Sequence, residues 1–228
     1  KRNHTRLLWV FEGFTSYYDD LQLLRSKRIN LKTYLKLVTD NWNGILRGPG
    51  RHKQSLADSS FDAWTKYYQA DENTPNAVVS YYGKGALLAL GLDLQIRAFT
   101  KNKKSLDDLV RLLWRKHGKE GIAEDGLDDL IFELLGNGFN KTWNEIKSRY
   151  IFGVEDIPLQ KWIDSNLISV KPKILSTLEK IKLQFGMRHM DANGWLKVTH
   201  VLDGGIAQAA GLATGDLIAS IDGQRVSS

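Results

Sequence analysis

The most restrictive feature of this sequence is a single carboxylate inside an aromatic and aliphatic run near its start. Glu12 lies in the middle of residues 8–18, LWVFEGFTSYY, and no Lys or Arg lies within one helical turn of it. We expect this run to be buried, and a buried carboxylate costs several kcal/mol unless another group compensates it. The sequence therefore predicts either a distant basic partner or a metal ion at Glu12.

Composition excludes several classes of protein. The 228 residues are enough for one large domain, or for one domain and part of another, and 42% hydrophobic content with seven Trp predicts a core rather than disorder. The absence of Cys excludes disulfides and thiolate metal sites. No apolar stretch is long enough to cross a membrane, so we expect no membrane partner. The net charge of +6 is spread among acidic residues, which predicts a solvated basic face and no nucleic-acid partner. Nothing in the sequence indicates the compartment.

Hydrophobic periodicity predicts a mainly helical region up to about residue 170. Helices are expected over residues 8–24, 31–38, 59–68, 78–99, 105–117, 127–135 and 141–150. Gly85 and Gly91 each cost a helix about 1 kcal/mol, so we expect them to allow close backbone approach. Ser105 and Asp108 have the spacing of a capping box, with Asp in place of the usual Glu.

The pattern changes to that of a small α+β unit from about residue 171. Strands are expected over residues 183–188, 195–201 and 217–221, with a short helix over 206–210. We therefore place a domain boundary near residues 169–173, which divides the chain into residues 1–170 and 171–228. Both ends look cut, so we expect a fragment of a longer protein.

Spacing alone does not favour a metal at Glu12. A Glu on a helix can be the third ligand of a zinc ion whose two His lie on another helix in an H-E-x-x-H pattern. This sequence has no such pattern, and its five His are never within one turn of each other. On spacing, a Glu paired with a distant base is favoured over a metal ligand.

A family resemblance changes that balance. Residues 8–18 resemble the third-ligand helix of the glycyl aminopeptidase family, bacterial zinc peptidases of the gluzincin type with a thermolysin-like catalytic core and a C-terminal PDZ domain. The resemblance continues through SFDAWTKYY at 60–68, SYYGKGAL at 80–87, LDLQIR at 92–97 and SLDD at 105–108. It implies a mainly α fold, the thermolysin-like C-terminal helical half of a catalytic domain, followed by a truncated PDZ domain. The H-E-x-x-H helix would then lie upstream of Lys1.

The resemblance also implies two site residues. Glu12 would be a zinc ligand. Tyr82 lies in YGKG, which is similar to the YEKG segment of related aminopeptidases; Gly83 replaces the Glu here. In those enzymes the Tyr hydroxyl donates a hydrogen bond to the oxyanion of the tetrahedral intermediate. Tyr81 is a rival that would point about 100° away on a helix. The alternative for Tyr82 is a core aromatic with a satisfied hydroxyl.

Other candidates near the site are weaker. Ser16, one turn after Glu12, would be placed to orient a zinc-bound His. Lys84 would pair with a carboxylate near the site, although an exposed Lys is the favoured interpretation, and Asp19 and Asp20 are expected at the surface. Four aromatic side chains would line a cleft or, at helical spacing, belong to the core: Phe61, Trp64, Tyr67 and Tyr68.

The C-terminal segment resembles a PDZ domain of the protease-associated type. The resemblance is carried by VTHVLDGGIA at 198–207, AGLATGDLI at 210–218 and IDG at 221–223. PDZ domains bind peptide ends by adding a strand to a sheet edge. We expect the carboxylate-binding loop around residues 183–186, and an incomplete groove because its helix should follow Ser228.

The resemblance therefore implies a fragment of a zinc-dependent aminopeptidase, and it implies that this enzyme removes small N-terminal residues, Gly or Ala, from peptides. Its partners would be a peptide substrate and a peptide or protein C-terminus at the PDZ domain. We expect the fragment alone neither to hold stoichiometric zinc nor to cleave peptides. The alternative is a non-catalytic peptide-binding scaffold, a helical domain fused to PDZ.

Overall fold

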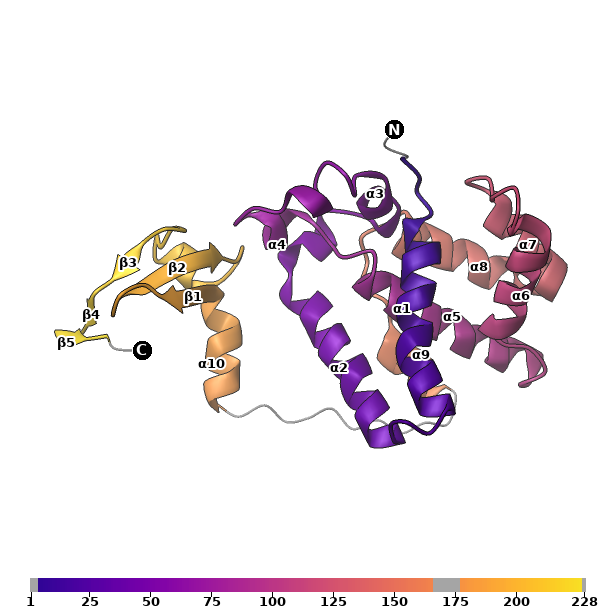
Figure 1. The fold of residues 1–228 in the computed structure, drawn as a ribbon, viewed down its shortest axis with the longest axis horizontal. Helices are drawn as coiled ribbons and strands as arrows, with labels where there is room; N and C mark the ends of the chain where they lie inside the picture. Colours follow the sequence, from indigo (N-terminus) through magenta and orange to yellow (C-terminus); the bar gives the residue numbers. More distant parts are fainter. Residues whose placement is uncertain (1–3, 166–176, 227–228) are drawn as a thin grey trace.

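The structure, a computed structural model, describes residues 4–165 and 177–226, and it consists of a helical region and a smaller α+β region (Figure 1). The helical region contains α1 (Leu8–Arg25), α2 (Leu31–Arg47), η1 (Pro49–His52), α3 (Leu56–Phe61), η2 (Tyr67–Gln69), α4 (Thr74–Ala77), α5 (Gly83–Thr100), α6 (Leu106–His117), α7 (Gly126–Leu135), η3 (Asn137–Phe139), α8 (Asn140–Ile146), the π-helical η4 (Lys147–Ile151) and α9 (Leu159–Asp164). The second region contains α10 (Thr177–Phe185), β1 (Met187–Asp191), β2 (Leu196–Val201), α11 (Ile206–Ala209), β3 (Leu217–Ile218), β4 (Ser220–Ile221) and β5 (Gln224–Arg225). The predicted fold class is confirmed.

Helix α5 forms the centre of the helical region, and α1 crosses it at a pair of glycines. A Cβ added to Gly13 would lie 2.7 Å from the backbone of Gly85, and one added to Gly85 would lie 2.9 Å from the Cα of Gly13. At Gly91 an added Cβ would lie 2.3 Å from the ring of Trp162 in α9. Both glycines of α5 therefore allow close packing, as the sequence predicted, and their cost to the helix is offset by burial.

Some predicted helices differ from the observed ones; the helix expected over 31–38, for example, continues to Arg47 as α2. The predicted helix over 59–68 is wrong, because α3 ends at Phe61 and the chain continues through turns to the short η2. Helix α5 begins at Gly83 rather than at residue 78, because Val79 pairs outside a helix: its N–H donates to the Gln54 side chain (3.1 Å), and its carbonyl accepts from the Ser59 hydroxyl.

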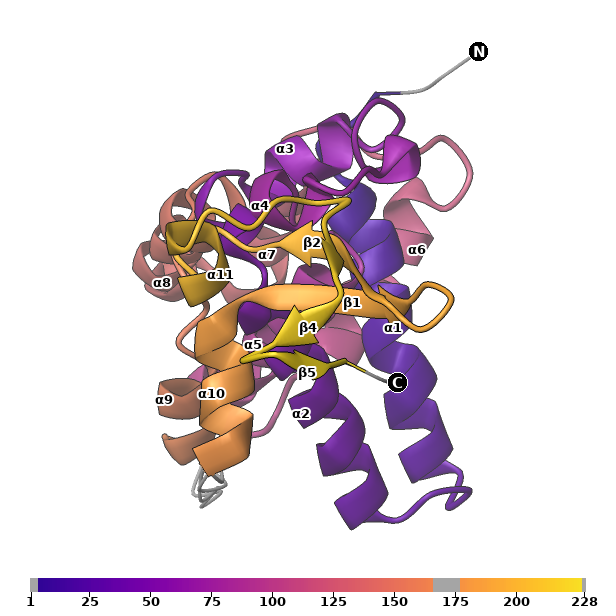
Figure 2. The ribbon, with the colours of Figure 1, turned by 90° about the vertical axis from the view of Figure 1, so that its left-hand side faces the viewer.

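The α+β region contains two small antiparallel sheets, one of order β1-β2-β3 and one formed by β4 and β5 (Figure 2). Residues 183–185 belong to α10 rather than to the predicted strand, because the chain turns at Gly186 (φ +66°) and β1 begins only at Met187. The predicted carboxylate loop therefore consists of a helix end and that turn. The predicted strand 217–221 divides between the two sheets. The predicted boundary at 169–173 lies outside the described residues.

Asn76 of α4 joins the two regions. Its amide donates to the carbonyl of Val201 (2.8 Å), and its side-chain oxygen accepts from the N–H of Asp203 (2.9 Å). Lys53 adds an ion pair with the Asp203 carboxylate at 2.5 Å. These contacts hold the loop after β2 against the helical region. Among the described helices, none has the length and apolar character needed to cross a membrane.

Candidate functional site

Glu12 lies on α1 at the edge of the helix's buried face. That face consists of Trp9, Val10, Gly13, Phe14 and Tyr17, which recur at helical spacing, and Glu12 falls beside it and is half-buried. The expectation of a buried carboxylate was therefore wrong, because the aromatic run wraps around the helix and only one side faces the core. Within the described residues the carboxylate has no hydrogen bond and no ion pair, so the predicted distant base is not found there.

Tyr82 lies just before α5 in a cluster of tyrosines. Its hydroxyl is 3.0 Å from the hydroxyl of Tyr68, and Tyr81 donates to the same Tyr68 oxygen at 3.1 Å. The rings of Tyr81 and Tyr82 stack with centroids 4.5 Å apart. The prediction that these two side chains diverge by 100° was wrong, because both precede the first helical residue of α5. Tyr81 is buried and Tyr82 half-buried, so of the two only Tyr82 presents substantial surface.

The surroundings of the Tyr82 hydroxyl favour its protonated form. The hydrogen bond with Tyr68 raises the pKa of Tyr82, and burial and the negative charge of Glu12 raise it further, against a hydrogen bond with Tyr81 that lowers it. A phenol with a raised pKa remains a hydrogen-bond donor at neutral pH. Glu12 precedes Gly13 and Tyr82 precedes Gly85 by three residues, so the close crossing of these two glycines brings the unpaired carboxylate and the protonated hydroxyl to the same part of the fold.

Gly83, which departs from the YEKG pattern, packs closely against side chains of α2. A Cβ at Gly83 would lie 2.7 Å from Oδ1 of Asn41. The amide of Asn41 donates to the carbonyl of Gly83 at 3.0 Å, and the N–H of Gly83 donates to the hydroxyl of Ser80 at 3.1 Å. The substitution therefore fixes the backbone that carries Tyr82, and Asn41 is a site residue that sequence reasoning missed.

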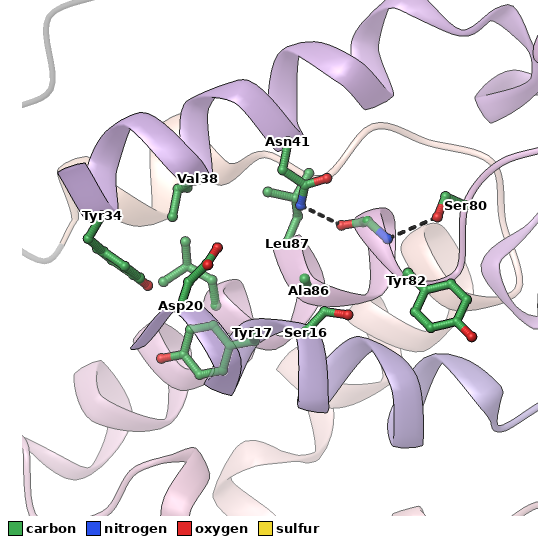
Figure 3. Close-up of a pocket in the computed structure, with 12 residues that line it drawn as sticks. Ser16, Tyr17, Asp20, Tyr34, Val38, Asn41, Ser80, Tyr82, Ala86 and Leu87 are labelled. Carbon is green, nitrogen blue, oxygen red and sulfur yellow. Dashed lines mark hydrogen bonds between the residues drawn. The ribbon is translucent and has the colours of Figure 1, made fainter. Parts of the chain in front are cut away.

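A cavity of about 320 Å³ begins at Tyr82 and extends between α1, α2 and α5 (Figure 3). Ser16, the weak candidate one turn after Glu12, lines it. Asp20 and Tyr34 line its other end. Neither was predicted there: Asp20 was expected at the surface, and Tyr34 carried no motif that would have marked it.

Lys84 is buried, which contradicts the expectation of an exposed side chain. It is 1% exposed, and its Nζ has no hydrogen-bond partner in the part of the chain that is described. Burial lowers the pKa of Lys84 to about 8. The charge of Asp156 partly offsets this shift, and the charge of Arg51 adds to it. The residue lies two positions after Tyr82, on the side of α5 that faces α2 and α9, where Trp42, Leu46 and Leu159 line the same small space.

The four candidate aromatics divide into two pairs. Phe61, Trp64 and Tyr68 are exposed, at 36%, 41% and 50%, so exposure alone does not divide them. Tyr67 packs on Tyr81 with ring centroids 5.0 Å apart, and Tyr68 bonds Tyr82. Only the second pair reaches the site, because η2 folds back onto the start of α5.

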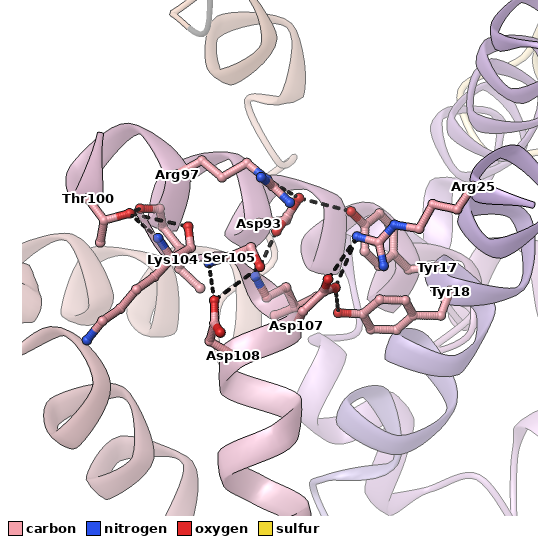
Figure 4. Close-up of polar contacts among 12 residues, drawn as sticks. Tyr17, Tyr18, Arg25, Asp93, Arg97, Thr100, Lys104, Ser105, Asp107 and Asp108 are labelled. Carbon is pink, nitrogen blue, oxygen red and sulfur yellow. Dashed lines mark hydrogen bonds and ion pairs between the residues drawn. The ribbon is translucent and has the colours of Figure 1, made fainter. Parts of the chain in front are cut away.

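A polar network beyond the cavity holds α1 against α5 and α6 (Figure 4). Asp93 accepts from the Tyr17 hydroxyl (3.1 Å), the Arg97 guanidinium (2.8 Å) and the N–H of Leu106 (2.7 Å). Asp107 accepts from the Tyr18 hydroxyl (2.7 Å) and pairs with Arg25 (3.1 Å).

This network surrounds the predicted capping box of α6, which is present at Ser105 and Asp108. It fixes the rotation of α1, and with it the direction of Glu12.

The described residues contain no group of three His, Cys, Asp or Glu side chains that could hold a metal ion. Glu12 can therefore supply one ligand of a metal site, but the described residues do not supply the other ligands. The sequence lacks the H-E-x-x-H pattern that would supply two of them.

Comparisons with known proteins agree with this architecture. Residues 1–88 match the family model of the M61 glycyl aminopeptidases, and residues 177–228 match that of the PDZ domain. The crystal structure of an aminopeptidase N family protein from Idiomarina loihiensis is similar, with a TM-score of 0.89 and 32% sequence identity. The similarity covers 100% of this chain and 40% of that chain, so this chain spans well under half the length of the protein it resembles. No curated protein matches the chain.

Proposed function

We propose that this chain, which carries a region of the M61 glycyl aminopeptidase family followed by a PDZ domain, is the helical half of a zinc-dependent aminopeptidase. The peptidase part would extend over residues 1–170 and the PDZ part over 171–228. One observation carries the proposal: the close crossing of α1 and α5 at Gly13 and Gly85 brings together the unpaired carboxylate of Glu12 and the hydroxyl of Tyr82.

Glu12 fits the role of a zinc ligand. Its carboxylate is half-buried and has no competing cation or donor within the described residues. Two further ligands and a general base would have to come from outside the described residues. When bound, zinc would supply Lewis-acid polarisation of the scissile carbonyl. Ser16, one turn along α1, would be placed to orient a neighbouring ligand.

Tyr82 would act on the substrate itself. As the peptide carbonyl becomes tetrahedral, its oxygen gains negative charge, and a preorganised hydroxyl aimed at that oxygen stabilises the transition state by about 3 kcal/mol. Tyr68 supports this role by positioning the Tyr82 hydroxyl, because the two phenol oxygens lie 3.0 Å apart. The substrate would be a peptide with a small N-terminal residue, Gly or Ala, as the family resemblance implies.

The test uses the intact protein and a matched pair of tyrosines. Tyr82→Phe should keep its zinc and lower turnover of an N-terminal glycyl peptide about a hundredfold or more. Tyr81→Phe removes a hydroxyl that bonds the same Tyr68 oxygen, and it should lower turnover much less. Equal turnover in the Tyr82→Phe variant and the wild type would refute the role of this residue.

The match of residues 177–228 to a PDZ domain also supports a second candidate, a non-catalytic scaffold that binds peptide ends. The two functions are separated by the sequence that precedes Lys1 in the intact protein. An H-E-x-x-H helix there supports the peptidase, and its absence supports the scaffold. In either case the PDZ part would bind a peptide or protein C-terminus at a sheet edge.

A further inference from the structure

The cavity beside Tyr82 is large compared with the N-terminal residue of the proposed substrate. Its volume of about 320 Å³ far exceeds what the side chain of Gly or Ala would fill. One end of the cavity is formed by Tyr82, Ser80 and Gly83, at the proposed site of reaction. A second substrate residue, the one that follows the scissile bond, is therefore the natural occupant.

The far end of the cavity is acidic and has no cation of its own. Asp20 of α1 and Tyr34 of α2 face each other there (Figure 3). Within the described residues the Asp20 carboxylate has no hydrogen bond and no ion pair. Tyr34 is only 7% exposed, and its hydroxyl likewise has no hydrogen-bond partner among those residues. Burial and the charge of Asp19 raise the pKa of Asp20, as expected for a carboxylate that lacks a counter-ion.

Two arginines near this part of α1 are engaged with other carboxylates. The guanidinium of Arg25 pairs with Asp107 at 3.1 Å, and that of Arg97 pairs with Asp93 at 2.8 Å. The wall between the two ends contains four apolar residues, Val38, Ala86, Leu87 and Leu90, together with Ser16, Tyr17 and Asn41. A channel that offers apolar surface along its length and ends at a carboxylate and a hydroxyl fits a long side chain with a terminal cation.

The length of the cavity agrees with such a side chain. Asp20 follows Glu12 by eight residues, which is about 12 Å along the axis of α1. An extended lysine or arginine side chain covers about half of that separation from its Cα, and the backbone of the bound peptide would cover the rest, whereas alanine or valine would not reach Asp20.

We propose that this cavity, lined by Asp20 and Tyr34, is the subsite for a basic side chain on the residue that follows the scissile bond, so that the preferred substrates are peptides beginning with a small residue followed by Lys or Arg. This inference rests on the proposed aminopeptidase function and names its substrate class. Asp20 is a specificity residue that acts by binding the substrate cation.

The test compares two peptides that differ only in charge. In the intact protein, kcat/KM for a Gly-Lys peptide should exceed that for the matching Gly-norleucine peptide by about tenfold or more, as expected for one hydrogen bond to a charged group. Asp20→Asn should abolish this preference, mainly through KM for the Gly-Lys peptide. Asp19→Asn is the matched control, because Asp19 is exposed and does not line the cavity; it should keep the preference.

The outcomes separate this inference from the proposed function. Cleavage of both peptides with equal kcat/KM, or a preference that survives Asp20→Asn, would overturn the subsite and leave the aminopeptidase intact. Failure to cleave any peptide with N-terminal glycine would overturn both.

Discussion

Replacement of Lys84 by methionine should make this protein more stable at neutral pH. The Lys84 side chain is 1% exposed, and its amine has no hydrogen-bond partner within the described residues. Burial lowers its pKa from 10.5 to about 8, so the charged form is disfavoured in the folded protein. At about 1.4 kcal/mol per pKa unit, that difference costs about 3 kcal/mol at pH 7. Methionine has a similar length and no charge, so Lys84→Met should recover most of this amount.

The dependence on pH gives the effect a signature. Because the folded pKa lies below the unfolded value, the penalty is complete below about pH 8 and disappears as pH rises toward 10.5. The gain from Lys84→Met should therefore be largest at pH 7 and shrink between pH 8 and 10.5.

Urea unfolding measured by tryptophan fluorescence suits this test, because all Trp residues except Trp195 lie within residues 1–165. Lys103→Met, at an exposed lysine, is the control and should change little. A Lys84→Met variant that is no more stable than the wild type at pH 7, or whose gain does not vary with pH, would refute the reasoning.

Three further predictions concern the packing around the site. Gly13→Ala should lower the free energy of unfolding in urea by about 1–3 kcal/mol, because its Cβ would lie 2.7 Å from the backbone of Gly85. Gly44→Ala is the comparison, because nothing lies within 4 Å of a Cβ added there. A smaller loss of stability in Gly13→Ala than in Gly44→Ala would contradict this prediction. Burial raises the pKa of Asp107, but Tyr18 and Arg25 outweigh it and the net pKa is lowered. The Asp107 carboxylate should therefore stabilise the fold at neutral pH, and this stabilisation should be lost as the pH falls through the lowered pKa. The wild type should then lose more stability in acid than Asp107→Asn. An equal loss of stability in the two proteins would argue against this prediction. Asn76→Ala should release the loop after β2 from the helical region, seen as faster amide hydrogen exchange at Asp203, and unchanged exchange would show that Lys53 alone holds the loop.

Features set by local sequence could be predicted. The capping box at Ser105 and Asp108 starts α6 where the spacing placed it, because both hydrogen bonds join residues three apart. Gly85 and Gly91 pack closely, as a glycine inside an apolar helix indicates. The family resemblance identified the peptidase and PDZ regions because it depended on several motifs together.

Features set by tertiary packing could not be predicted from the sequence. Whether Glu12 faces the core or its edge depends on where α5 crosses α1, and a run of aromatic residues does not encode that. The burial of Lys84 depends on α2 and α9 covering one side of α5, and lysine is normally exposed. The cavity that ends at Asp20 and Tyr34 is formed by helices distant in sequence, so neither residue carried a recognisable signal.

The zinc content of the intact protein tests the central claim most directly. The claim is that the unpaired carboxylate of Glu12 binds the metal beside Tyr82. Elemental analysis should find one zinc per chain in the wild type and in Tyr82→Phe, and a large loss in Glu12→Gln, which keeps the size of the side chain and removes its charge. Full zinc occupancy in Glu12→Gln would contradict the account.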